Sequence, residues 1–184
     1  MGALSVKLEI LKNVPLDCGE VIIRKFKLKD IIGYYNLVSD KKVYKFLRSR
    51  NLRNYPAVET FLLSIINSYS LNAETRFSIA MNTTDEIVGA VSMYIDKRDR
   101  GVELGYWVGY PYWNRGYMTS VMNASVNMLE KINDIDFVYA RIHKENKGSL
   151  RVVEKAGFKL EKLEGDIMTF RKELRAVDFS SRVY

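Results

Sequence analysis

The sequence has few of the residues that build disulfide-linked or metal-bound cores. Its 184 residues include one cysteine, one histidine and three prolines. Cys18 has no second cysteine to pair with, and Cys18 with His143 cannot supply the ligands of an ordinary zinc site. We therefore expect no metal site. The low proline content and the hydrophobic fraction of 47% also argue against a mainly disordered chain.

Long hydrophobic runs are missing as well. Runs such as Phe61–Leu63 and Ile65–Ile66, separated by Ser64, fall far short of the ~20 residues that a membrane-spanning helix needs. The first residues do not have the pattern of a signal peptide. We expect a cytoplasmic protein without a membrane partner. At ~150 residues per domain, the length predicts one domain.

Positive charge is in excess. Lysine and arginine number 29 against 22 aspartates and glutamates, which gives a net charge of +7. An excess of this size favours anionic partners but does not identify them. Nucleic acid, an acidic protein surface, a phosphate-bearing cofactor and a merely basic surface all remain open on charge alone.

The hydrophobic periodicity predicts one α/β (α+β) domain with a mixed sheet and helices on both faces. Residues 1–19 are interpreted as an N-terminal extension with a possible strand at Val6–Leu11, and residues 174–184 as a tail. Residues 48–56 read as a loop, and Gly157 as a helix C-cap. Within the domain, 20–173, strands are expected at 20–26, 76–81, 86–95, 102–108, 137–142, 158–163 and 167–173, and helices at 29–38, 40–47, 57–71, 117–131 and 149–156.

The segment around Gly116 has the features of an anion site. An expected strand ends near Gly109, a short loop with Pro111 follows, and Asn114-Arg115-Gly116 opens a long helix. The first backbone N–H groups of a helix have no partner within it and lie at the positive end of its dipole. Gly116 allows a ligand to approach the backbone, and Arg115 adds positive charge. A phosphate or diphosphate fits here; a solvated helix start is the alternative.

A second segment, residues 145–158, opens another helix. Asn146 and Ser149 lie three residues apart, directly after an expected strand. Either side chain fits the role of a helix cap with no further function.

Together the two segments resemble the GNAT acetyltransferase superfamily, and within it the RimJ/RimL-type branch of ribosomal-protein N-terminal acetyltransferases. The likeness covers residues 20–173. It rests on Val21–Phe26 with Leu28–Asp30 and Ser39-Asp40, Glu103–Gly109, Tyr112–Thr119, and Asn146–Ser149 with Glu154–Phe158.

The resemblance implies a mostly antiparallel sheet that splays between its fourth and fifth core strands, where acetyl-CoA enters as the acetyl donor. It assigns the pantetheine arm to Trp107, Val108 and Gly109. It assigns the diphosphate to Trp113, Asn114, Arg115, Gly116, Tyr117 and Met118, with Asn146 and Ser149 also near the cofactor. Trp113 and Met118 depart from the family pattern, and Met118 is bulkier than the usual residue. Lys144, Lys147 and Arg151 are expected near the ribose phosphate.

The resemblance also implies catalytic roles. Amine acetylation needs a base, a donor to the oxyanion and an acid for the thiolate. Glu103 is the candidate base, acting through a water, and the Val108 N–H is the candidate oxyanion donor. Val153 stands where many relatives have an acidic tyrosine, so Ser149 is the candidate acid and Asn146 orients cofactor or water.

The expected activity is an acetyl-CoA-dependent N-acetyltransferase that modifies a primary amine, with a protein or peptide N-terminal α-amine as first choice. The alternatives are a small amine, such as a polyamine or aminoglycoside, and a non-catalytic CoA-binding module. Val153 disfavours polyamines. Arg48, Arg50, Arg53 and Tyr55 suggest a basic, aromatic acceptor groove. A homodimer is possible, and direct nucleic-acid binding is not expected.

Overall fold

The computed structural model describes residues 3–47, 52, 54–71, 74–96 and 99–174. No helix in these ranges is long and apolar enough to span a membrane. The elements are α1 (Ala3–Lys12), β1 (Leu16–Asp17), β2 (Val21–Arg24), α2 (Asp30–Val38), α3 (Lys41–Tyr44), α4 (Tyr55–Ser68), β3 (Arg76–Met81), β4 (Ile87–Asp96), β5 (Gly101–Val108), the 3-10 turn η1 (Tyr110–Tyr112), α5 (Tyr117–Leu129), β6 (Phe137–His143), α6 (Lys147–Lys155), β7 (Lys159–Glu164) and β8 (Ile167–Glu173).

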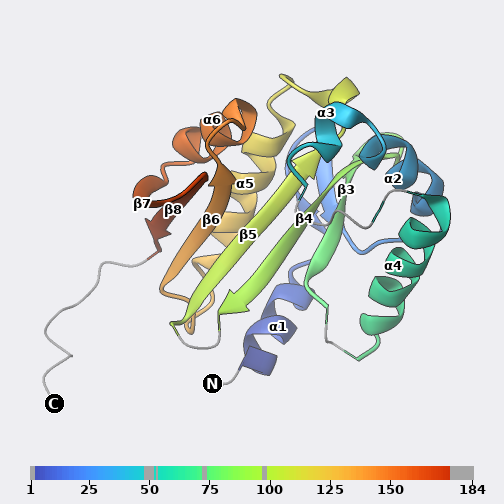
Figure 1. The fold of residues 1–184 in the computed structure, drawn as a ribbon. Helices are drawn as coiled ribbons and strands as arrows, with labels where there is room; N and C mark the ends of the chain where they lie inside the picture. The colour runs from blue at the N-terminus through green and yellow to red at the C-terminus, as the bar shows by residue number, and fades with distance from the viewer. Residues whose placement is uncertain (1–2, 48–51, 53, 72–73, 97–98, 175–184) are drawn as a thin grey trace, which may run out of the picture.

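The strands form one sheet in the order β1-β2-β3-β4-β5-β6-β8-β7. Every neighbouring pair is antiparallel except β5 and β6, which are parallel. A parallel pair needs a crossover connection, and α5 supplies it on one face of the sheet. Helices α2 and α4 lie on the other side (Figure 1). The mixed, mostly antiparallel sheet between helices confirms the fold class predicted from the sequence.

Strands β5 and β6 pair only over a short stretch at their start. Gly101, Val102 and Glu103 lie opposite Phe137, Val138 and Tyr139, and no further pair forms although β5 continues to Val108 and β6 to His143. Counted from β2, these are the fourth and fifth strands of the sheet. The predicted splay is therefore confirmed, and it opens beyond Glu103.

The first residues differ from the sequence-based expectation. The strand expected at Val6–Leu11 is wrong, because Ala3–Lys12 forms helix α1. Its buried residues Val6, Ile10 and Leu11 follow helical spacing, which the short alternation of the sequence concealed, and they join the hydrophobic core. Strand β1 then pairs with β2. The domain boundary at residue 19 stays a prediction.

The end of the expected loop at 48–56 also differs. Helix α4 begins at Tyr55, with Asn54 as its N-cap and Pro56 in its first turn. The Asn54 side chain accepts a hydrogen bond from the Ala57 N–H at 2.9 Å. Proline is favoured at this place because the N–H that it lacks has no partner within the helix. Asp40 caps α3 in the same way as Asn54 caps α4. The helix end expected at Gly157 is confirmed, because Gly157 follows the last turn of α6 with a positive φ of 79°.

A buried ion pair joins β2 to the start of α2. Nη1 and Nη2 of Arg24 donate to the two carboxylate oxygens of Asp30 at 2.7 and 2.9 Å. The Arg24 Nε donates to Asp85, in the turn between β3 and β4, at 2.5 Å. Burial lowers the pKa of Arg24, but the contacts with Asp30 and Asp85 outweigh it and hold the pKa above its usual value. The network fixes α2 against the sheet.

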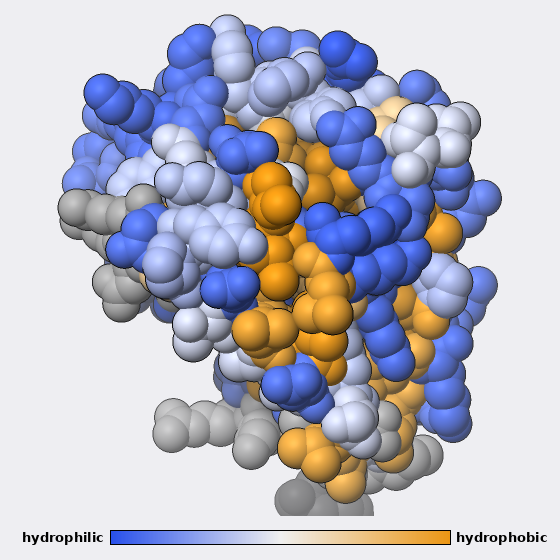
Figure 2. All heavy atoms as spheres, turned by 90° about the vertical axis from the view of Figure 1, so that its right-hand side faces the viewer, coloured by the Kyte–Doolittle hydropathy of each residue, from blue (hydrophilic) through white to orange (hydrophobic). Residues whose placement is uncertain are grey.

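The outer side of α2 and α4 carries hydrophobic residues at the surface. Figure 2 shows them as a band between polar regions on this side of the molecule. The exposed members in and next to these two helices are Leu28, Ile32, Leu63 and Leu71.

We expect Arg24→Met to lower the free energy of unfolding by about 3–5 kcal/mol, because it leaves the Asp30 carboxylate buried without its partner. Lys12→Met removes the cation of an exposed pair with Glu9 and is the matched control, with an expected cost of about 0–1 kcal/mol. Urea denaturation measures both. Equal losses in the two variants would contradict the structural role of the Arg24 network.

Candidate active site

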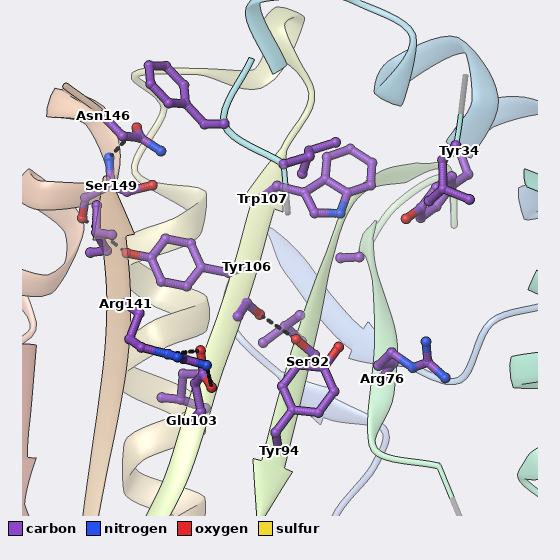
Figure 3. Close-up of a pocket in the computed structure, with 18 of the residues that line it drawn as sticks. Tyr34, Arg76, Ser92, Tyr94, Glu103, Tyr106, Trp107, Arg141, Asn146 and Ser149 are labelled. Carbon is purple, nitrogen blue, oxygen red and sulfur yellow. Dashed lines mark hydrogen bonds and ion pairs between the residues drawn. The ribbon is translucent and has the colours of Figure 1, made fainter. Parts of the chain in front are cut away.

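A pocket of about 180 Å³ lies where β5 separates from β6. Side chains from β5, β6 and α6 line one end, and side chains from α2, α4, β3 and β4 line the other (Figure 3). The lining residues include Tyr34, Phe61, Arg76, Glu103, Tyr106, Trp107, Arg141, Asn146 and Ser149. Among the predicted catalytic residues, the pocket brings together Glu103, Asn146 and Ser149.

Glu103 forms an ion pair across the splay. Nε and Nη2 of Arg141 donate to its two carboxylate oxygens at 3.0 and 2.8 Å. Glu103 is 7% exposed and lies at the last paired position of β5. Hydrogen bonding to Glu103 raises the pKa of Arg141, so this guanidinium stays charged. Each carboxylate oxygen has two lone pairs, and the Arg141 donors take one on each.

The end of β5 turns backbone groups toward the opening. The Gly109 N–H donates to the Val88 oxygen, and Val108 faces Gly89 across the antiparallel pair. Because successive residues of a strand direct their N–H groups to opposite sides, the Val108 N–H points away from β4 and toward the splay. The Val108 oxygen on that side accepts from the Trp113 Nε1 at 2.7 Å.

Tyr106 bridges the splay to α6. Its hydroxyl donates to the Ser149 backbone oxygen at 3.0 Å. Burial raises the pKa of Tyr106, so the phenol stays protonated and the bridge persists at neutral pH. The Asn146 side chain accepts from the Ser149 N–H at 3.2 Å and is the N-cap of α6. Of the two candidate caps, Asn146 performs this role, and Ser149 lies in the first turn of the helix.

Residues 113–118 form a cradle at the start of α5. Asn114 and Gly116 have positive φ values of 60° and 83°, and Gly116 is the N-cap. A Cβ at Gly116 would meet no atom within 4 Å, so the space over its backbone is open. The first-turn N–H groups of α5 face this space with the positive end of the dipole. The cradle therefore fits a phosphate-bearing ligand.

Two unusual residues of the cradle have separate structural roles. Met118 is 8% exposed and belongs to the hydrophobic core, so its side chain does not fill the cradle. Trp113 is 40% exposed. It contacts Tyr110 edge-on with 5.3 Å between the ring centroids, and it binds the Val108 oxygen as described above. Tyr117 is buried, and Arg115 lies 5.9 Å from the Tyr112 ring.

The basic residues at the far end of β6 are only partly available to a ligand. Lys144 forms an ion pair with Asp166 at 2.7 Å, and hydrogen bonding to that carboxylate raises the pKa of Lys144. Lys147 begins α6 and Arg151 lies on its exposed side. Val153 is fully buried on the same helix, where it packs in the core.

The other end of the pocket combines aromatic walls with one arginine. Tyr34 contacts Trp107 edge-on with centroids 5.0 Å apart, and Phe61 lies beside both Tyr34 and Arg76. The Arg76 Nε donates to Glu74 at 2.8 Å, and its Nη2 contacts the same carboxylate. Among the residues that the structure describes, no acceptor lies on its Nη1.

Several pocket residues were not predicted, among them Tyr106, Arg141 and Arg76. Arg141 and Glu103 are 38 positions apart in sequence, and only the parallel register of β5 and β6 brings them together. Tyr106 and Arg76 lie on predicted strands, where alternation alone does not identify a functional side chain. The predicted groove residues Arg48, Arg50 and Arg53 lie outside the described residues, whereas Tyr55 begins α4 and contacts Tyr35.

The comparisons identify similar proteins. A family model described as acetyltransferase (GNAT) domain matches residues 20–159. An uncharacterized N-acetyltransferase, p20, from Bacillus licheniformis is 25% identical over 146 residues, which cover 78% of this chain and 82% of the relative. An acetyltransferase (GNAT family) from Bacillus anthracis has a TM-score of 0.76 at 19% identity, with 86% of this chain and 98% of that chain covered.

Solved structures with different ligands share the fold. The microcin C7 self immunity acetyltransferase MccE, in complex with acetyl-CoA and AMP, has a TM-score of 0.71 at 20% identity, with 84% of this chain and 92% of that chain covered. A spermidine N-acetyltransferase from Vibrio cholerae, in complex with CoA and spermine, has a TM-score of 0.69 at 16% identity, with 84% and 96% covered. At these identities the likeness shows the fold and leaves the acceptor open.

Proposed function

The chain belongs to the GNAT acetyltransferase family and is an N-acetyltransferase with acetyl-CoA as acetyl donor, and we propose that its acceptor is the α-amine of a protein or peptide N-terminus. The proposal includes membership of the RimJ/RimL-type branch. A ribosomally made polypeptide presents its α-amine in the cytoplasm, which is therefore the proposed compartment. The observation that carries the acceptor class is the charge of the pocket.

The pocket has little negative charge for a polycation. Among its described lining residues Glu103 is the one carboxylate, and Arg141 binds both of its oxygens. A polyamine has several cationic groups, each of which needs a partner once it leaves water. A peptide N-terminus has one amine followed by neutral amide groups. The Nη1 of Arg76 suits the first amide oxygen, and Phe61 and Trp107 form an apolar wall for a side chain.

The cofactor is assigned to the splay and the cradle. We propose that the first-turn N–H groups of α5, from Gly116 onward, hold the diphosphate and that β5 from Trp107 to Gly109 binds the arm that enters the splay. Acetyl-CoA supplies, when bound, the thioester carbonyl that the amine attacks. The open space over Gly116 and the buried position of the Met118 side chain support this assignment and disfavour a blocked site.

Three groups of the chain are proposed for the chemistry. Glu103 accepts the amine proton through a water, while Arg141 holds the carboxylate in place. The Val108 N–H, directed into the splay, is the donor for a carbonyl oxygen in which negative charge develops. Ser149, in the first turn of α6, donates a hydrogen bond from its Oγ to the leaving thiolate, and a proton that the thiolate takes from it is replaced in the same step by one from water. Asn146 orients this turn as its cap.

We expect Gly116→Val to weaken acetyl-CoA binding at least tenfold, because a branched side chain fills the space that the diphosphate needs. Gly19→Val is the matched control: Gly19 has a similar φ of +87° and equally open space, but it is not a cradle residue and lies in the turn before β2. Isothermal titration gives the Kd, and thermal melts measure the backbone strain common to both variants. Equal Kd values in the two variants would remove the cradle from the site.

We expect Glu103→Gln to lower kcat by ~10²–10⁴ while acetyl-CoA affinity stays the same, because loss of a general base slows the chemical step. Steady-state kinetics and direct titration measure the two effects. Full turnover by Glu103→Gln would mean that another group accepts the proton.

Ser149→Ala and Asn146→Ala separate catalysis from capping. Ser149→Ala keeps the N–H that Asn146 caps, so it should slow turnover and spare the melting temperature. Asn146→Ala should cost about 1 kcal/mol of stability, the usual effect of a lost cap. If Ser149→Ala turned over at the wild-type rate, the proposed acid would be wrong.

The acceptor is tested by acetyl-CoA turnover across peptides with free N-termini, the same peptides with blocked N-termini, spermidine and an aminoglycoside. We expect kcat/KM to be highest for free peptide N-termini, and blocking to abolish the reaction. Arg76→Ala should raise the peptide KM and leave the slow reaction with spermidine unchanged. A preference for spermidine would overturn the acceptor class and leave the transferase activity in place.

A further inference from the structure

The end of the pocket lined by α2, α4, β3 and β4 contains hydrogen-bond donors without acceptors. Tyr34, on α2, is 4% exposed, and its hydroxyl points into the pocket on the side of Trp107 (Figure 3). Burial raises the pKa of Tyr34, although a hydrogen bond from Trp107 acts against the shift, so the phenol keeps its proton. Among the described residues, none accepts a hydrogen bond from this hydroxyl. A buried donor of this kind indicates a ligand or water that supplies the acceptor.

Two further donors face the same part of the pocket. They are the hydroxyl of Tyr94, on β4, and the Nη1 of Arg76, on β3. Neither has an acceptor among the residues that the structure describes. Arg76 interacts electrostatically with both phenols, Tyr34 and Tyr94, and Phe61 contacts the Tyr34 ring and the Arg76 guanidinium. The three donors therefore lie around one part of the pocket.

Glu74 fixes the Arg76 guanidinium without using up its charge. The Glu74 carboxylate accepts from the Arg76 Nε at 2.8 Å and also contacts Nη2. It accepts as well from the backbone N–H groups of Thr75 and Arg76, both at 2.8 Å. Hydrogen bonding to Glu74 raises the pKa of Arg76, so the guanidinium stays charged. Because four donors share the negative charge of Glu74, Arg76 keeps a positive potential toward the pocket.

Three donors without an acceptor favour a ligand group that only accepts hydrogen bonds. A carboxylate is such a group, because its two oxygens offer about four lone-pair sites and no hydrogen. Its hydrogen bonds to a guanidinium are also stronger than those between neutral groups. A side-chain amide fits less well, because its N–H groups would face the donors. Among the described lining residues Glu103 is the one carboxylate, and Arg141 binds it, so the pocket itself supplies no carboxylate to these donors.

The strand register places the donors near the group proposed to accept the amine proton. Tyr94 lies directly opposite Glu103 in the β4–β5 pair, and Arg76 lies opposite Ser92, two residues from Tyr94 on β4. Neighbouring strands are ~4.8 Å apart and alternate residues of a strand ~6.7 Å apart, so the backbones of Arg76 and Glu103 are separated by roughly 12 Å. Their side chains span part of this distance. The remainder fits the first two residues of a peptide, at ~3.5 Å per residue.

We propose that Tyr34, Tyr94 and Arg76 form a carboxylate subsite, which selects peptide acceptors that have an aspartate or glutamate as first or second residue. The inference rests on the proposed transfer to a peptide N-terminus and adds the side chain that is preferred there. The Nη1 of Arg76 carries two N–H groups, so it can bind the first amide oxygen and the side-chain carboxylate together.

Peptides with an amidated C-terminus test the selection when aspartate or asparagine occupies the first, second or fourth position. At the first or second position we expect kcat/KM to be higher for aspartate on the order of tenfold or more, the usual effect of hydrogen bonds to a charged group. At the fourth position we expect the two peptides to react alike. An equal preference for aspartate at the fourth position would mean that the net charge of +7 attracts any acidic peptide, and it would overturn the subsite.

Tyr34→Phe and Tyr94→Phe each remove one hydroxyl and keep the ring. We expect each variant to lower the ratio of kcat/KM for the aspartate peptide to that for the asparagine peptide several-fold, while the acetyl-CoA Kd stays the same. Tyr35→Phe is the matched control: Tyr35 is the next residue of α2, contacts Tyr55 and does not line the pocket, so the ratio should not change. A ratio that stays constant in both pocket variants overturns the subsite.

The outcomes separate the subsite from the proposed function. Equal rates for aspartate and asparagine peptides would overturn the subsite and keep the peptide acceptor. Turnover of no peptide would overturn the peptide acceptor, and the selection proposed for it as well. Free aspartate is included because it is a second source of a carboxylate close to an amine. If it were the best acceptor and Tyr94→Phe slowed its reaction, the subsite would be supported and the peptide acceptor overturned.

Discussion

The site depends on one constraint, the early end of pairing between β5 and β6. Beyond Glu103 and Tyr139 the two strands diverge. The backbone groups of β5 that would pair with β6 must therefore find other partners. The Trp113 Nε1 donates to the Val108 oxygen, and the Tyr106 hydroxyl donates to the Ser149 backbone oxygen in α6. The Val108 N–H remains directed into the gap. An opening in the middle of a sheet is costly unless its polar groups find partners. Here side chains of the chain satisfy part of the edge, and the rest is the surface at which we propose that the cofactor arm binds.

The ion pair of Glu103 and Arg141 lies at the point of divergence and has two consequences. It joins β5 to β6 just where their backbone pairing ends. It also neutralises the carboxylate nearest to the opening, which changes what the pocket can bind. A base that a guanidinium holds with fixed geometry loses little conformational freedom when it acts, and preorganisation of this kind is a general source of catalytic power. In the proposed mechanism, the contact with Arg141 sets both the position of Glu103 and its role as a base.

The sequence predicted most of the elements and part of the site, and the differences have physical causes. The strands from β2 to β8 and the cradle around Gly116 follow from periodicity and glycine placement, which are local signals. Helix α1 was misread because Val6, Leu8 and Ile10 alternate with polar residues, whereas the buried stripe of the helix is Val6, Ile10 and Leu11. Arg141 was missed because its partner is brought near by register, which one sequence does not encode locally. Either Asn146 or Ser149 fitted the cap, and only the side-chain geometry decided between them.

The net charge of +7 does not extend into the pocket. Arg141 is balanced by Glu103, and Arg76 by Glu74 behind it, so the lining is close to neutral although the chain is basic. Surface charge acts over about a Debye length of ~8–10 Å and affects the rate of encounter, whereas selection inside a desolvated pocket depends on whether each charged group finds a partner. Surface charge therefore affects how fast a partner arrives, and the pocket lining affects which group is bound. An anionic partner is attracted by the surface as a whole. A second cation in the pocket would meet Arg76 or Arg141 in place of a free carboxylate, which supports the proposed acceptor, a single amine flanked by hydrogen-bonding groups.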